Sequence, residues 1–162
     1  MQKSILLVLL LLVLALVSLP AVAQKAEIFG GYQFTHLRPA YNASGWNASL
    51  TGNFKHVLGI TADFSGAYKD SVDFHTFTAG PVFTARLPVA QPFVHALFGG
   101  ATLSGFGDSN TGFAMILGGG LDVGFRKGLG IRLVQVDWIG TRFNGTTSNS
   151  NGRASAGIVL KF

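Results

Sequence analysis

Cysteine is absent from this chain, and charged residues are scarce. None of the 162 residues is Cys, and Asp, Glu, Lys and Arg together make up only 12%, about half of the usual share in soluble domains. Without cysteine the chain has no disulfide, no thiol nucleophile and no thiolate metal site. If the chain is secreted, its stability must therefore come from another closed network.

Clusters of positive charge are also missing. The formal charge is +5, but the Lys and Arg residues are scattered singly and form no basic run. Proteins that bind nucleic acid concentrate positive charge on one face or segment, so nucleic acid is not expected as a partner. The glycine runs at 99–100 and 118–120 lack the pattern of a phosphate loop and indicate close strand packing instead.

The chain is rich in apolar, aromatic and small residues. Hydrophobic residues make up 48%, and there are 14 Phe and 22 Gly. This composition is too apolar for a disordered chain and too rich in glycine for a helical bundle. The length fits one domain.

The N-terminus has the order of a secretory signal peptide. Lys3 precedes an unbroken apolar run, Ile5–Val17, and a small-residue tripeptide ends at Ala23. The alternative is a membrane-anchoring helix, but the run is shorter than the roughly 20 residues that span a bilayer, and Pro20 follows it. We expect a signal peptide over residues 1–23 and a mature barrel domain over 24–162.

The rest of the chain alternates between apolar and polar residues. No later stretch is apolar and long enough to cross a membrane as a helix, so membrane residence would require strands. The alternation is clearest from Trp46 to Lys55, where Trp46, Leu50 and Phe54 share one parity with the small residues between them. It recurs over 58–69 and in the last strand, and the total is eight strands.

Three segments alternate less cleanly. Residues 74–87 require a change of phase near Thr76, which predicts a β-bulge there or a part of the strand that stands above the membrane. Residues 92–103 are apolar on both parities. In segment 129–143, Arg132 falls on the apolar face near the strand end, where it could snorkel.

The links between strands alternate in length. The links at 55–56, 87–91 and 126–128 are tight, and those at 38–44, 69–71, 104–110 and 144–151 are more polar. Outer-membrane barrels have an even number of strands, short periplasmic turns and longer outer loops. The sequence therefore predicts an all-β fold, an eight-stranded antiparallel up-and-down transmembrane β-barrel.

Side-chain size decides which parity faces outward. The interior of an eight-stranded barrel is only just wide enough for side chains, and the apolar parity holds bulky rings such as Trp46, Phe64 and Phe125. The polar parity is rich in Gly, Ser, Thr and Asn, which fit a narrow lumen. The alternative is a soluble, lipocalin-like barrel with these rings inside, around an apolar ligand.

The sequence of the C-terminal strand resembles that of a known class of proteins. Its alternating apolar residues and terminal aromatic, Ile158, Leu160 and Phe162, resemble the assembly signal of bacterial outer-membrane barrels. Together with the eight-strand plan over 24–162, the chain resembles the small OmpA/OmpX-type outer-membrane β-barrel families. Segments 77–81 and 92–100 are similar to those of uncharacterised members. The resemblance implies an outer-membrane location and contact with outer-membrane lipid and with the barrel-assembly machinery. It does not identify any functional residues.

Charged residues on the polar parity are expected to pair inside the lumen, because unpaired charges there would be costly. Closure should bring Glu27 on the first strand next to Lys161 on the last. The candidates for this structural network are Glu27, Lys55, Asp63, Lys69, Arg86, Asp122, Arg126, Asp137, Arg153 and Lys161.

No catalytic, cofactor-binding or metal-binding residues are predicted. The even spacing of His36, His56, His75 and His95 reflects strand length rather than a shared metal site. His75 lies near Asp73 and Ser71, but the His-x-Ser motif of lipid A deacylases is missing, so a solvated cluster explains these residues better.

The leading hypothesis is a non-enzymatic outer-membrane barrel that anchors the envelope or presents its outer loops. Candidate binding loops are 42–46, 105–111 and 144–152, with an unknown partner. The alternatives are a narrow porin-like channel, the soluble ligand-binding barrel and, with least support, an outer-membrane acyl-transfer enzyme.

Overall fold

The computed structural model describes residues 26–162 except 38–40, 56, 106 and 127. The predicted signal peptide lies outside the described residues. Within the described part, no helix is long and apolar enough to cross a membrane.

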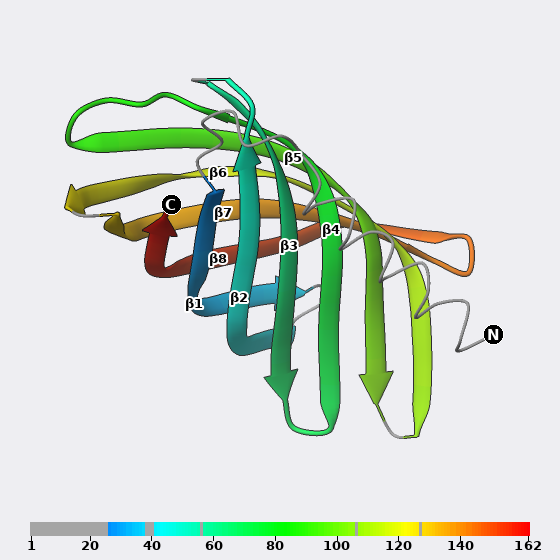
Figure 1. Ribbon diagram of the computed structural model, residues 1–162. Coiled ribbons are helices and arrows are strands. Elements are labelled where there is room, and N and C mark those ends of the chain that lie inside the picture. The colour runs from blue at the N-terminus through cyan, green and yellow to red at the C-terminus, as the bar shows by residue number, and fades with distance from the viewer. Residues whose placement is uncertain (1–25, 38–40, 56, 106, 127) are drawn as a thin grey trace, which may run out of the picture.

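Eight antiparallel strands form one closed barrel in sequence order (Figure 1), as predicted. Each strand pairs with its neighbours in the chain, and β1 pairs with β8 to close the wall. The strands are β1 (Ala26–Leu37), β2 (Tyr41–Asn53), β3 (Leu58–Lys69), β4 (Val72–Thr84), β5 (Ala90–Gly105), β6 (Asp108–Arg126), β7 (Leu129–Phe143) and β8 (Thr146–Lys161).

The described chain starts and finishes at the same end of the barrel, which we call the terminal end. There the Phe162 N–H donates to the Ala26 carbonyl over 2.9 Å. The opposite end, the hairpin end, carries the β1–β2, β3–β4, β5–β6 and β7–β8 connections. These are shorter than the predicted loops, because β2, β6 and β8 already begin at Tyr41, Asp108 and Thr146.

The β7–β8 connection is a tight turn. Its central residues Asn144 and Gly145 have φ values of 46° and 83°. Positive φ at both central positions defines the type I′ geometry that Asn-Gly favours, because this turn matches the twist of the two flanking strands. Local sequence thus keeps this hairpin short.

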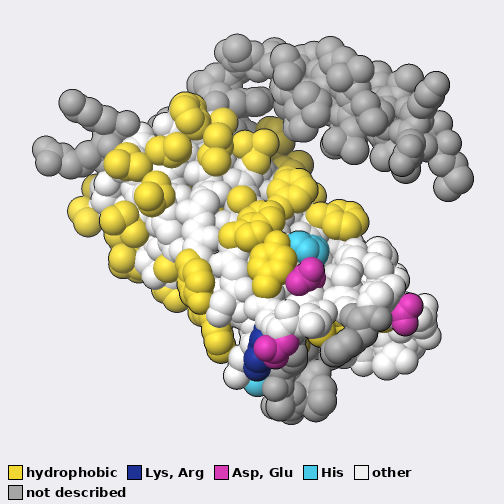
Figure 2. Space-filling model, turned by 90° about the horizontal axis from the view of Figure 1, so that it is seen from below, with side chains coloured by type: hydrophobic (Ala, Val, Ile, Leu, Met, Phe, Trp, Pro, Cys, Tyr) yellow, Lys and Arg dark blue, Asp and Glu magenta, His cyan; other side chains and the backbone are white. Residues whose placement is uncertain are grey.

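Apolar side chains face outward and polar ones face inward. Leu50, Ile60 and Leu160 are 46%, 52% and 41% exposed, whereas Thr61 and Asp63 are buried. Hydrophobic side chains accordingly cover much of the visible flank in Figure 2. The predicted orientation is confirmed, and the lipocalin-like alternative, which needs the opposite facing, is excluded.

Strand β4 has no change of phase near Thr76, so the predicted bulge is wrong. Phe74, Thr76 and Thr78 are all buried, and the pairing of β4 with β3 is continuous across them. Phe74 faces inward because the lumen is apolar at this height. A cluster of buried residues at the hairpin end comprises Leu37, Ala43, Ala67, Phe74, Ala101 and Ala114; we call it the apolar plug.

A β-bulge occurs in β7 instead. The register with β8 shifts between Arg132 and Gln135, and the two residues between them, Leu133 and Val134, are both exposed. The extra residue reverses the parity, so Arg132 is buried in the lumen and does not snorkel on the outside. Gln135, on the other side of the bulge, also faces the lumen.

Strand β5 reads as apolar on both parities because both of its faces contact apolar surroundings. Val94 and Phe98 are exposed on the outside. On the inside Leu97 packs with Ile116 and Ile139 in a second buried cluster, which we call the middle layer.

Candidate functional site: the barrel lumen

The lumen contains a network of paired charged side chains contributed by strands around the barrel. Its central member is Arg153 on β8, whose side chain is fully buried. Its Nε donates to Asp137 Oδ2 over 2.7 Å, and its Nη1 donates to Asp63 Oδ1 over 2.9 Å. Asp63 lies on β3, so Arg153 connects opposite parts of the barrel wall.

Asp137 has further donors. His95 Nε2 lies 2.8 Å from Asp137 Oδ1, and Gln135 Nε2 donates to Asp137 Oδ2 over 2.8 Å. Asp63 also accepts a hydrogen bond from Asn47 Nδ2 over 2.9 Å. Both carboxylates are therefore held by charged and amide donors, which is what an ion needs when it is removed from water.

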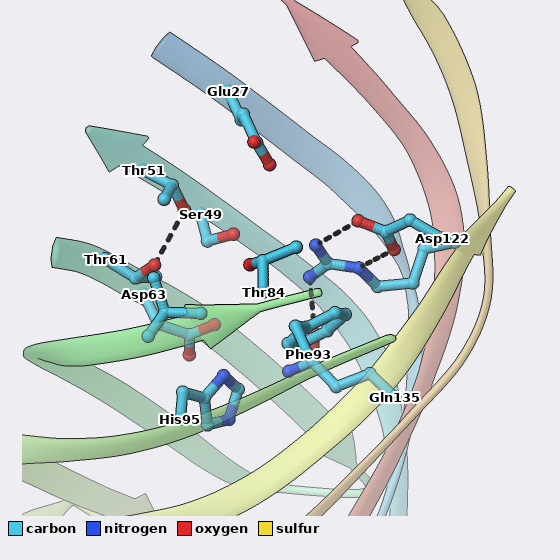
Figure 3. Close-up of a pocket in the computed structure, with 12 residues that line it drawn as sticks. Glu27, Ser49, Thr51, Thr61, Asp63, Thr84, Phe93, His95, Asp122 and Gln135 are labelled. Atoms are coloured by element: carbon cyan, nitrogen blue, oxygen red, sulfur yellow. Dashed lines mark hydrogen bonds and ion pairs between the residues drawn. The ribbon is translucent and has the colours of Figure 1, made fainter. Parts of the chain in front are cut away.

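A second node surrounds Arg132. Its Nε and Nη2 donate to the two oxygens of Asp122 over 2.7 and 3.0 Å, a bidentate pair, and its Nη1 donates to Gln135 Oε1 over 2.6 Å. The guanidinium lies between two rings, with its Cζ 4.2 Å from the centroids of both Phe29 and Phe93. Its two polar partners come from neighbouring strands, Asp122 from β6 and Gln135 from β7 (Figure 3).

At the terminal end Glu27 contacts two positively charged side chains. Its Oε1 lies 3.3 Å from Lys161 Nζ and 3.3 Å from Arg86 Nη2, and Asn53 Nδ2 donates to the same oxygen over 2.8 Å. The predicted contact between Glu27 and Lys161 is confirmed. Lys161 also contacts the amide of Gln91.

Not every predicted residue lies in the lumen. Lys55 is exposed in the β2–β3 turn and Lys69 is exposed at the hairpin end, so both predictions are wrong. Strand β2 ends at Asn53, and the alternation does not continue into the turn. The side chain of Arg126 lies outside what the structure describes. The remaining predicted residues meet in the network: Glu27, Asp63, Arg86, Asp122, Asp137, Arg153 and Lys161.

The alternation missed two members of this network. Arg132 was hidden by the bulge, and His95 lies in the segment that is apolar on both parities, whereas Gln135 shares the polar parity of Asp137 and faces inward as expected. With Arg132 included, four carboxylates face four Lys or Arg side chains among the described lumen residues.

The histidines do not converge on a shared site. His95 is buried beside Asp137, His36 is exposed beside Asn42, and the ring of His75 contacts that of Tyr68. His56 lies outside the described residues. Within the described part of the chain, no group of three His, Asp or Glu side chains is arranged to hold a metal.

Little open space is left between the network residues. The cavity between Glu27, Asp63, His95 and Arg132 has a volume of about 10 Å³, close to what a single water molecule requires. Above it, toward the hairpin end, lie the middle layer and the apolar plug. Over the described residues, the lumen is filled by its own side chains.

Comparisons with known proteins agree with this geometry. No protein-family model matches the chain, and no curated protein matches it in sequence. Among solved structures, Neisserial surface protein A (NspA) is similar, with a TM-score of 0.67, 14% identity and coverage of 86% of this chain and 97% of that one.

Two further outer-membrane proteins are similar. The N-terminal β-barrel domain of Pseudomonas aeruginosa OprF has a TM-score of 0.62 and 10% identity, covering 86% of this chain and 97% of that domain. Ail of Yersinia pestis, in complex with the heparin analogue sucrose octasulfate, has a TM-score of 0.55 and 20% identity, covering 86% of this chain and 99% of that one. The chain therefore has the fold of the small, eight-stranded OmpA/OmpX-type outer-membrane β-barrels.

Proposed function

We propose that the mature chain is a non-enzymatic protein of the bacterial outer membrane with a structural role in the envelope. The observation that carries this proposal is the combination of an apolar outer surface with a charged, internally paired lumen. Leaving a large apolar side chain in water rather than burying it costs about 1.5–3 kcal/mol. Such exposed side chains occur on every strand, for example Ile28, Leu50, Ile60, Phe77, Val94, Leu117, Ile131 and Ile158.

A bilayer removes this cost and suits a closed barrel. In the hydrocarbon core every backbone polar group must be bonded within the protein, and a sheet without edges meets this condition. The apolar outside then contacts lipid tails. In this setting the terminal end would face the periplasm, because both ends of the described chain lie there.

We propose that the barrel-assembly machinery recognises the chain through its C-terminal strand. Ile158, Leu160 and Phe162 form one exposed row on the outside of the barrel, 56%, 41% and 70% exposed. Strand β8 closes the barrel by pairing with β1. Until this pairing forms, its backbone edge is available to an assembly partner, and the apolar row lies beside that edge.

Recognition of a partner by long loops has little support. Two-residue connections such as Asp70–Ser71 and Asn144–Gly145 replace the predicted loops. The described charges near the hairpin end are mixed in sign, with Lys69, Arg142, Asp70, Asp73 and Asp108. The Ail structure contains a polyanion, and this mixture does not favour a comparable ligand here.

Fractionation of cells, combined with gel electrophoresis of unheated and boiled samples, tests the proposal. We expect the protein in the outer-membrane fraction, with a band that shifts on boiling because the closed barrel resists detergent until it is heated. Recovery in the soluble periplasmic fraction would contradict the proposal.

A further inference from the structure

The mouth of the barrel at the hairpin end contains a hollow that the structural role does not use. It is lined by residues of β1, β4, β5, β7 and β8, so it lies on the barrel axis above the apolar plug. Its walls are Leu37, Phe74, Leu103, Thr141, Phe143, Ser148 and Asn151.

The floor of this hollow is apolar, and four of its seven described lining residues are apolar. Leu37 and Phe74 are buried members of the apolar plug, and Phe143 packs against the plug. Leu103, which is 37% exposed, forms part of the rim. An apolar concavity that opens outward is costly to fill with water, and the mouth of a β-barrel is a common position for small-molecule sites.

The volume of the hollow limits the size of an occupant. It measures about 160 Å³, and an engineered protein cavity of about 150 Å³ lined by Leu, Ile and Phe binds benzene. The hollow thus has room for one six-membered ring. A folded lipid chain or a peptide segment would not fit.

One wall of the hollow is polar and uncharged. Thr141 and Asn151 are buried there, on β7 and β8, and Asn151 Nδ2 lies 3.5 Å from Ser148 Oγ. No Lys, Arg, Asp or Glu is among the described lining residues. An occupant should therefore be neutral, with an apolar body and one group that forms hydrogen bonds.

We propose that this mouth is a binding site for a small neutral monocyclic phenol. The ring lies against Phe74 and Leu103, and the hydroxyl faces Thr141 and Asn151. The site has no exit through the barrel, because the apolar plug and the middle layer close the lumen below it. The protein therefore binds the phenol and does not transport it. The inference goes beyond the proposed structural role, although access from outside the cell rests on the orientation proposed there.

Binding of 4-fluorophenol and fluorobenzene to the full mature chain in lipid nanodiscs, followed by fluorine NMR, tests the proposal. Empty nanodiscs report partition of the probes into lipid. Leu103→Trp places a large ring in the mouth, and Leu117→Trp places the same ring on the lipid-facing side of β6 as the matched control. Thr141→Val removes one hydroxyl from the polar wall with little change in shape.

We expect saturable binding of both probes to the wild type and to the Leu117→Trp variant, and an affinity at least about 10-fold lower in Leu103→Trp. Loss of one hydrogen bond of about 1 kcal/mol in Thr141→Val should weaken 4-fluorophenol about fivefold and leave fluorobenzene unchanged. Equal binding by the two Trp variants, or no saturable signal from wild-type protein, would overturn the proposal. A heat-modifiable band from the same nanodiscs shows that the barrel is folded, so failure here is distinct from failure of the membrane assignment.

Discussion

Single residues decide whether the charged lumen is stable. Arg153 is fully buried and is bound to Asp137 and Asp63 on two other strands. Removing one partner of a buried ion pair costs more than the pair itself contributes, because the remaining charge stays buried without compensation.

Arg153→Met should therefore lower the free energy of unfolding by about 3–5 kcal/mol. The substitution leaves two carboxylates in the lumen without their shared cation. Urea unfolding in phospholipid vesicles measures the change. Arg142→Met, at an exposed position near the hairpin end, is the control and should change the free energy by less than about 0.5 kcal/mol.

Lys161 and Lys55 should behave differently although the sequence pattern places both on the polar parity. Lys161→Met leaves Glu27 with one cation fewer, and we expect a loss of about 1–3 kcal/mol. Lys55→Met acts on an exposed turn and should have almost no effect. Similar losses for both variants in the same unfolding assay would contradict the placement of Lys55 outside the lumen.

Sequence could predict much of the network at this scale, because a charge in a barrel strand must face the lumen. Asp63, Asp137 and Arg153 follow directly from this argument. Lys55 was misplaced because alternation says where a side chain points within a strand but not where the strand ends. His95 was missed because its apolar neighbours hide the inward parity of β5.

At the scale of the element, β7 differs from a simple alternating strand. The bulge at Leu133 and Val134 exposes two neighbouring side chains and turns Arg132 toward Asp122. The sequence signal for this is weak, since an Arg on the apolar parity fits either a bulge or a side chain that snorkels. Only the bidentate contact with Asp122 distinguishes them.

The bulge makes a prediction about neighbouring residues. Leu133→Arg and Val134→Arg should both destabilise the barrel, each by up to about 2–4 kcal/mol at the depth of the bilayer centre, because both side chains face lipid. Unfolding in vesicles measures both, and Thr147→Arg on the exposed hairpin is the control. Stability equal to that of the wild type for either Arg variant would contradict the contact of that side chain with lipid.

Strands β3 and β8 followed the predicted alternation, whereas β4 and β5 departed from it for one reason. The prediction assumed a lumen that is polar throughout, but this lumen has an apolar plug and an apolar middle layer. Phe74 and Leu97 therefore face inward, and no rule based on polarity alone could separate them from lipid-facing residues.

At the scale of the whole molecule, the described side chains close the lumen below the open mouth at the hairpin end. A charged network occupies the half near the terminal end, and apolar layers occupy the half near the hairpin end. We infer that the barrel does not conduct ions. Reconstitution in planar bilayers should show no steps above the baseline, whereas reproducible single-channel currents from purified protein would contradict this inference.

The fold by itself does not specify a role. A de novo designed transmembrane β-barrel is also similar to this chain, with a TM-score of 0.52 and 12% identity. A designed sequence can therefore adopt this architecture. The features of this barrel from which a role can be argued are the charged content of its lumen and the apolar mouth at the hairpin end.

Quenching of Trp46 by brominated phospholipids tests the orientation of the barrel wall most directly. The chain has two Trp, and Trp138→Phe leaves Trp46, which is 44% exposed on the outside of β2, as the single reporter. We expect bromine on the lipid acyl chains to quench its fluorescence strongly and aqueous acrylamide to quench it little. Strong quenching by acrylamide with no effect of bromine would contradict an apolar surface in contact with lipid.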